Sequence, residues 1–117
     1  MSWWIALLNT LAGIASTGFG VAALVKPGLI APASDLGARS RFYPAMYASR
    51  AIPLGVAVGL VVWAAPDSVF LSLLLGVAVL AQIGDVVIGV TYRLPGMILG
   101  AVFAVVCHGT AIISALL

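Results

Sequence analysis

The chain has 117 residues, of which 64% are hydrophobic and 7% are charged. A soluble domain carries roughly 25% charged residues, so this composition excludes an ordinary water-soluble fold. The five Lys and Arg residues outnumber the three Asp and Glu residues, but they form no basic patch. We therefore expect membrane lipids, and not nucleic acid, as the partner of this surface.

Four segments are apolar over about 20 residues, the length that an α-helix needs to cross a bilayer. They are Trp3–Val25, Pro44–Ala65, Val69–Thr91 and Pro95–Leu117. The first segment follows no basic stretch and contains no convincing cleavage site, so we expect it to remain as a helix. The sequence predicts an all-α integral membrane four-helix bundle with antiparallel up-down spans, forming a single transmembrane domain over residues 1–117.

The link over residues 26–43 is the longest connection between these segments. Loops longer than about 12–15 residues are usually functional or carry structure of their own. We expect part of this loop to form a short interfacial helix capped at Ser34 and to cover the mouth of the bundle.

The basic residues predict the orientation. We call side A the membrane face that receives the 26–43 loop and the turn at Arg93, and side B the face that receives both termini and the turn at Asp67. Lys26, Arg39, Arg41 and Arg93 all fall on side A, and side B has no Lys or Arg. The positive-inside rule makes side A cytoplasmic and places both termini outside.

Aromatic residues agree with this layering, because tryptophan and tyrosine concentrate at the two membrane interfaces. Trp3, Trp4 and Trp63 fall at side B, and Tyr43, Tyr47 and Tyr92 fall at or near side A.

Asp85 lies inside the third segment, and a carboxylate in the bilayer costs at least about 2.5–3.5 kcal/mol unless it is compensated. Arg50 follows Pro44 by six residues and Asp85 precedes Thr91 by six residues, so both lie about 9 Å from side A. A tight turn joins the second and third helices, which should therefore lie side by side. We expect an Arg50–Asp85 ion pair, either as a lock between two helices or as a functional site.

Further polar residues could extend this site. Pro53 removes one helical hydrogen bond and frees the Ser49 carbonyl beside Arg50, which favours a polar pocket open toward side A. Candidate ligand-binding residues at compatible depths are Gln82, Tyr47, Ser16, Thr17 and, deeper in the membrane, Asn9. Arg50, Asp85 and His108 are the candidates for proton transfer or charge stabilisation.

His108 and Asn9 come out at similar depths near side B, so they could hydrogen-bond. His108 is then either a neutral core residue or a proton carrier. No metal site is expected, because Cys107 and His108 are adjacent and point to different sides of a helix. The single cysteine also excludes an intrachain disulfide, and no cofactor motif is present.

Small residues recur at four-residue spacing in three segments, as Ala12, Ser16 and Gly20, as Gly55 and Gly59, and as Gly96, Gly100 and Ala104. Such stripes let helices approach closely in lipid. They predict either close packing within the bundle or a seam between copies of a homo-oligomer.

Two motifs carry a family resemblance. Arg50-Ala-Ile-Pro-Leu-Gly55 early in the second helix and Gly84-Asp85 late in the third resemble the small four-helix bacterial membrane proteins of the DoxX-like type. The resemblance implies a four-helix bundle in a bacterial inner membrane and little about mechanism. Small multidrug resistance transporters are similar in length and helix number, but they use a glutamate in the first helix, and this chain has no Glu.

Three hypotheses follow for function. The first is a bundle that binds a lipophilic small molecule in a polar pocket around Arg50 and Asp85, with isomerisation or cyclisation of that molecule as an extension. The second is a non-enzymatic membrane subunit or scaffold in which the pair is structural. The third is a small proton-coupled transporter with Asp85 or His108 as the carrier.

Overall fold

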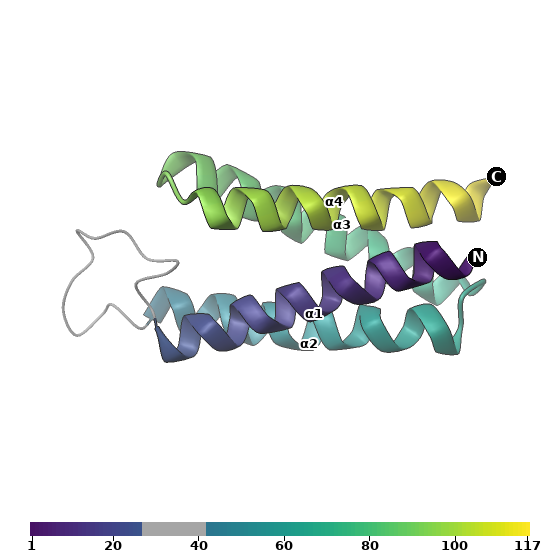
Figure 1. Ribbon diagram of the computed structural model, residues 1–117, viewed down its shortest axis with the longest axis horizontal. Helices are drawn as coiled ribbons and strands as arrows, with labels where there is room; N and C mark the ends of the chain where they lie inside the picture. The colour runs from purple at the N-terminus through teal and green to yellow at the C-terminus, as the bar shows by residue number, and fades with distance from the viewer. Residues whose placement is uncertain (27–41) are drawn as a thin grey trace.

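The computed structural model describes residues 1–26 and 42–117. The predicted interfacial helix at Ser34 lies outside these described residues. Within them the chain forms four α-helices: α1 (Trp3–Val25), α2 (Phe42–Ala64), α3 (Val69–Thr91) and α4 (Pro95–Leu116) (Figure 1). All four are long and apolar enough to cross a membrane, which confirms the predicted all-α four-helix bundle of an integral membrane protein.

The helix ends follow from local chemistry. The structure describes α2 from Phe42, two residues before the predicted start, and Pro44 lies close to this end of the helix. The Ser68 hydroxyl caps α3 by accepting a hydrogen bond from the Leu71 amide at 3.1 Å. Arg93 takes a positive φ of 57° in the turn between α3 and α4. This left-handed residue lets the chain reverse directly into α4, which has Pro95 at its first position.

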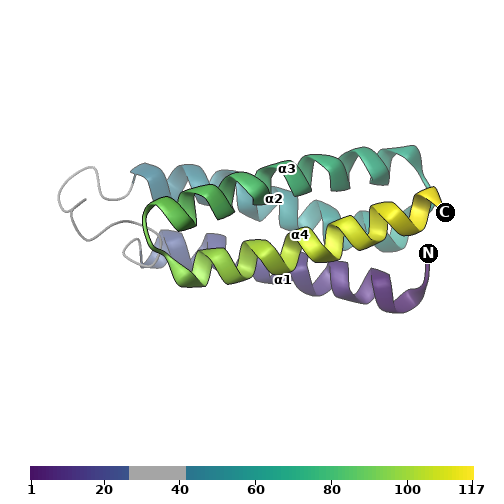
Figure 2. The same ribbon diagram turned by 90° about the horizontal axis from the view of Figure 1, so that it is seen from above.

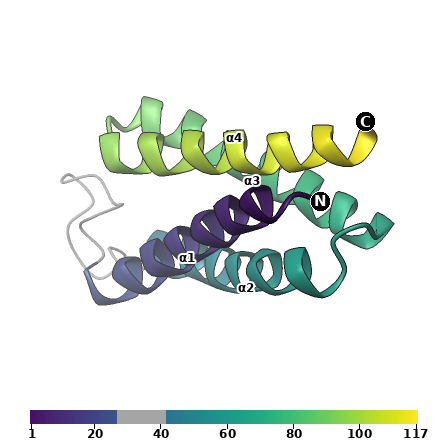
Figure 3. The same ribbon diagram turned by 45° about the vertical axis from the view of Figure 1, so that its right-hand side comes forward.

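The bundle consists of two helical hairpins. α1 packs along α2 and α3 packs along α4, whereas α2 and α3 touch only sparsely. Figure 2 shows the two hairpins as stacked layers, with α4 over α1 and α3 over α2. The prediction that α2 and α3 lie side by side is therefore correct only in part. Their connection is short, but the helices separate as they run from the Asp67 turn toward the opposite end (Figures 1 and 3).

The crossing of α1 and α2 depends on two glycines. A Cβ atom at Gly13 would lie 2.5 Å from the Gly55 carbonyl oxygen, and one at Gly55 would lie 2.5 Å from the Gly13 carbonyl oxygen. Gly55 belongs to the predicted stripe of small residues and packs within the bundle, but Gly13 lies beside its stripe and was missed. Gly59 and Gly96 face open space, where an added Cβ would meet nothing within 4 Å.

The main apolar core joins the two hairpins near side B. It is formed by buried residues from all four helices, namely Ile5, Ala6, Val58, Val62, Leu71, Leu75, Ala78 and Ala111. The hairpins are thus held together by apolar packing near side B, and α1 also contacts α4. Nearer side A, polar residues lie between the hairpins as well.

Candidate functional site

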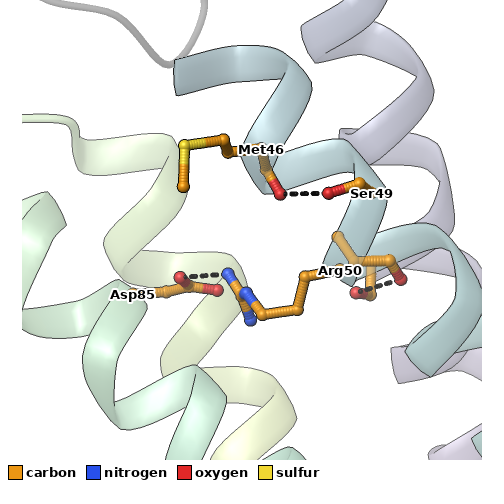
Figure 4. A network of polar contacts seen from close by, with 6 residues as sticks. Met46, Ser49, Arg50 and Asp85 are labelled. Atoms are coloured by element: carbon orange, nitrogen blue, oxygen red, sulfur yellow. Dashed lines mark hydrogen bonds and ion pairs between the residues drawn. The ribbon is translucent and has the colours of Figure 1, made fainter. Parts of the chain in front are cut away.

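The predicted ion pair between α2 and α3 is present. Arg50 Nη2 donates a hydrogen bond to Asp85 Oδ1 at 2.6 Å (Figure 4). The Asp85 side chain is 5% exposed and the Arg50 side chain is 38% exposed. A buried carboxylate therefore has its counter-charge on the neighbouring hairpin, which offsets the cost of placing it in hydrocarbon.

Local geometry explains why Arg50 can reach. The two residues lie at equal height, and the long arginine side chain extends across the space between the diverging helices (Figure 4). The guanidinium carbon of Arg50 lies 5.5 Å from the centre of the Tyr47 ring, a cation–π contact one turn away on α2. Nη1 is buried and has no hydrogen-bond partner among residues 1–26 and 42–117. The two N–H donors of Nη1 are therefore unused.

A small cavity lies beside Asp85, between the two hairpins. Its volume is about 20 Å³, which exceeds the roughly 10–15 Å³ that a water molecule needs and is far below the roughly 300 Å³ of a typical ligand pocket. All four helices line it, through Ala12, Ala15, Ser16, Phe19, Tyr47, Gln82, Asp85, Met97, Gly100, Ala101 and Ala104. The predicted candidates Ser16, Tyr47, Gln82 and Asp85 are therefore brought together.

Gln82 is the cavity residue whose hydrogen-bonding capacity is least used. Gln82 is 7% exposed. Within the described part of the chain, its amide makes no hydrogen bond. Ser16 differs, since its hydroxyl donates to the Ala51 carbonyl at 3.3 Å and so offers only lone pairs to the cavity. Gln82 thus presents both a free donor and a free acceptor in a largely apolar interior.

Arg50 itself is not part of the cavity wall. It approaches Asp85 from the α2 side, whereas the cavity lies toward α1 and α4. Arg50 therefore acts on the cavity through Asp85, by fixing the carboxylate in place and balancing its charge. Of the two charged residues of the predicted pocket, Asp85 lines this cavity and Arg50 contacts Asp85.

The predicted contribution of Pro53 is not found in the cavity wall. Pro53 and Ser49 are both exposed on α2, which continues through Pro53 as a helix. The Ser49 hydroxyl donates to the Met46 carbonyl at 2.8 Å (Figure 4). Both residues face outward because they lie one turn apart on the same outer face of the helix.

Asn9 and His108 form a second polar cluster. Asn9 Oδ1 lies 2.7 Å from His108 Nδ1, so the predicted hydrogen bond between α1 and α4 is confirmed. Asn9 Nδ2 donates to the carbonyls of Ile5 at 2.9 Å and Cys107 at 3.0 Å. Because Oδ1 can only accept, His108 must carry its proton on Nδ1.

The two polar clusters are separate. Ala12, Ala104 and Cys107 form a buried apolar layer next to the cavity, with Leu8 packed against it. Neither His108 nor Asn9 lines the cavity. The structure therefore groups His108 with Asn9 and away from Asp85.

Thr17 also lies away from the cavity. A Cβ atom at Gly55 would lie 2.6 Å from its hydroxyl, which places Thr17 at the crossing of α1 and α2. Another polar contact between these helices escaped the sequence analysis, since the Trp63 indole donates to the Thr10 hydroxyl at 2.7 Å. The apolar wall residues Phe19 and Met97 were also missed. Only their helical spacing from Ser16 and Ala101 could have indicated them.

Among residues 1–26 and 42–117, no group of three or more His, Cys, Asp or Glu side chains lies close enough to hold a metal ion. The side chains that line the cavity can supply hydrogen bonds, from Gln82, Tyr47 and Ser16, and an electrostatic interaction with Asp85. Comparisons of the chain with protein-family models, with curated proteins and with solved structures find no match.

Proposed function

We propose that the protein binds a lipophilic small molecule, with the polar group of that molecule in the cavity beside Asp85. The observation that carries this proposal is the Gln82 side chain, which belongs to a residue only 7% exposed, lines the cavity and makes no hydrogen bond within the described residues. A ligand group that pairs with the Gln82 amide gains a hydrogen bond, which contributes about 0.5–1.5 kcal/mol.

The proposal includes a location and a family. The lack of Lys and Arg on side B supports a cytoplasmic side A, with both termini and the Asp67 turn outside. The motifs around Arg50 and Asp85 support a DoxX-like protein of a bacterial inner membrane.

The proposal is tested by extracting the protein from its own membrane in polymer-bounded lipid discs and identifying the small molecules that remain bound to it. Ala101→Leu fills the cavity from α4, and Val102→Leu enlarges the neighbouring, exposed side chain as a matched control. Mass spectrometry of organic extracts should find a compound with the wild type and Val102→Leu that falls at least tenfold with Ala101→Leu. Equal extracts from all three proteins would contradict the proposal.

A second candidate function is a membrane scaffold or subunit. It is favoured by the position of the Arg50–Asp85 pair, which bridges two helices that otherwise touch sparsely. In a scaffold the pair fixes the distance between hairpins, and no compound should be lost when the cavity is filled. The extraction experiment therefore separates the two functions.

A further inference from the structure

The hydrogen-bonding groups that face the cavity define what it can accept. Tyr47 and Gln82 can donate, while Gln82, Ser16 and Asp85 can accept. Arg50 binds Oδ1 of the Asp85 carboxylate, and within the described ranges no hydrogen bond reaches Oδ2. Donors and acceptors thus lie together on the wall of one small space, and a group that both donates and accepts matches them.

The charge of the site restricts the ligand further. Asp85 is the only acidic residue within the four helices, and Arg50 already balances it. An anionic group in the cavity would face the Asp85 carboxylate directly. A cationic group would compete with Arg50 for the Asp85 carboxylate. Either would leave a net charge in the bilayer, where an unpaired charge is costly.

Size and surroundings indicate how such a ligand would lie. A volume of about 20 Å³ holds a group the size of a hydroxyl. The walls that belong to α1 and α4 are small residues, namely Ala12, Ala15, Gly100, Ala101 and Ala104. The Phe19 ring lies over Gly100, where its Cε2 atom would be 3.1 Å from an added Cβ. The Phe19 ring thus covers the cavity at Gly100, and an alkyl chain attached to a bound group would leave between α1 and α4 only if this ring turned aside.

We infer that the cavity receives the hydroxyl group of an uncharged lipophilic alcohol, which donates to Asp85 and accepts from Gln82 while its alkyl chain runs between α1 and α4. This inference rests on the proposed function and adds the chemical class of the ligand. Its distinguishing feature is the preference for an uncharged group over a charged one on the same chain.

The test uses the whole protein in phosphatidylcholine nanodiscs and radiolabelled 1-dodecanol as the probe. Binding to empty nanodiscs is subtracted to remove partition into lipid. Unlabelled dodecanoate and dodecylammonium at pH 7 serve as competitors with the same chain length. Gln82→Leu removes the amide at nearly constant volume. Thr110→Val is the control, because the Thr110 hydroxyl bonds to the Val106 carbonyl of its own helix at 2.7 Å and does not line the cavity.

We expect saturable binding of 1-dodecanol, competition by the charged compounds only at concentrations at least tenfold higher, and at least tenfold weaker binding to Gln82→Leu with no change for Thr110→Val. Equal or better competition by a charged compound, with binding still sensitive to Gln82→Leu, would overturn the inference and leave the proposed function standing. Binding of 1-dodecanol that ignores Gln82→Leu would also overturn the inference. If neither the alcohol nor the charged compounds bind saturably, the inference and the proposed function both fail.

Discussion

The guanidinium of Arg50 on α2 contacts the carboxylate of Asp85 on α3 at 2.6 Å. These two helices are consecutive in the chain, yet they touch each other only sparsely. Apolar packing joins the hairpins near side B, and this ion pair joins them nearer side A. It bridges α2 and α3, while α1 and α4 supply the other contacts between the hairpins.

Breaking the pair from one side should cost more than removing it altogether. Arg50→Leu leaves the Asp85 carboxylate buried without a counter-charge, which should lower the free energy of unfolding by about 3–5 kcal/mol. The double variant Arg50→Leu/Asp85→Leu should lie within about 1 kcal/mol of the wild type, because no charge is then left unpaired. Unfolding in mixed micelles measures both values. If the double variant loses as much stability as Arg50→Leu and Asp85→Leu lose together when measured singly, the pair is not coupled.

The Asn9–His108 contact predicts the protonation of the imidazole. Asn9 uses its amide hydrogens on the Ile5 and Cys107 carbonyls, so His108 should be the Nδ1–H tautomer with Nε2 unprotonated. Nitrogen-15 NMR of labelled histidine distinguishes the two ring nitrogens directly. A spectrum of the Nε2–H tautomer would contradict the arrangement.

The same cluster should contribute to stability. Asn9→Leu leaves His108 Nδ1–H without its acceptor and removes the side-chain hydrogen bond to the Cys107 carbonyl, which should cost about 1–3 kcal/mol. Thr110→Val is the matched control on α4, and it should change the free energy of unfolding by less than about 0.5 kcal/mol. Similar losses for both variants would mean that the buried cluster has no special role.

The glycine crossing of α1 and α2 gives a steric prediction with a control on the same helix. Gly55→Ala should destabilise the protein by about 1–3 kcal/mol, because its Cβ would overlap the Gly13 carbonyl oxygen. Gly59→Ala, one turn along α2, meets nothing within 4 Å and should be neutral or stabilising by roughly 0.5–1 kcal/mol. Thermal unfolding in detergent compares the two. If Gly55→Ala is as stable as Gly59→Ala, the close crossing is wrong.

The proposed orientation can be tested by cysteine labelling. In a Cys107→Ala background, a membrane-impermeant maleimide added to intact cells should label Asp67→Cys and should label Tyr92→Cys only after lysis. Both positions are exposed and lie in turns at opposite ends of the bundle. The reverse pattern would place side A outside.

The length and depth of the apolar segments were sufficient to predict the helices and the ion pair. Three of the four helix starts agree with the predicted ones, and counting residues from side A placed Arg50 level with Asp85. The depth of a residue in the membrane, however, does not reveal from which side Arg50 approaches Asp85. Arg50 therefore proved to lie outside the cavity wall, a result that depends on the rotation of α2 about its axis.

The pairing of helices was also beyond the sequence. A short turn at Asp67 limits how far α2 and α3 can separate at one end, but it does not set the angle between them. The close packing lies instead within each hairpin, at Gly13 and Gly55 and at Gly89, where an added Cβ would lie 2.8 Å from the Ile98 side chain. These contacts favour the pairing of α1 with α2 and of α3 with α4. Neither Gly13 nor Gly89 differs in sequence context from glycines that face open space.

The bonds of Asn9 also bear on how the protein is made. Ribosomes synthesise α1 long before α4, so the Asn9 side chain enters the lipid when only the Ile5 carbonyl of its own helix is within reach. Its remaining partners, the Cys107 carbonyl and His108, are nearly a hundred positions later in the chain. Asn9 can therefore form its hydrogen bonds to Cys107 and His108 only after α4 has been inserted beside α1.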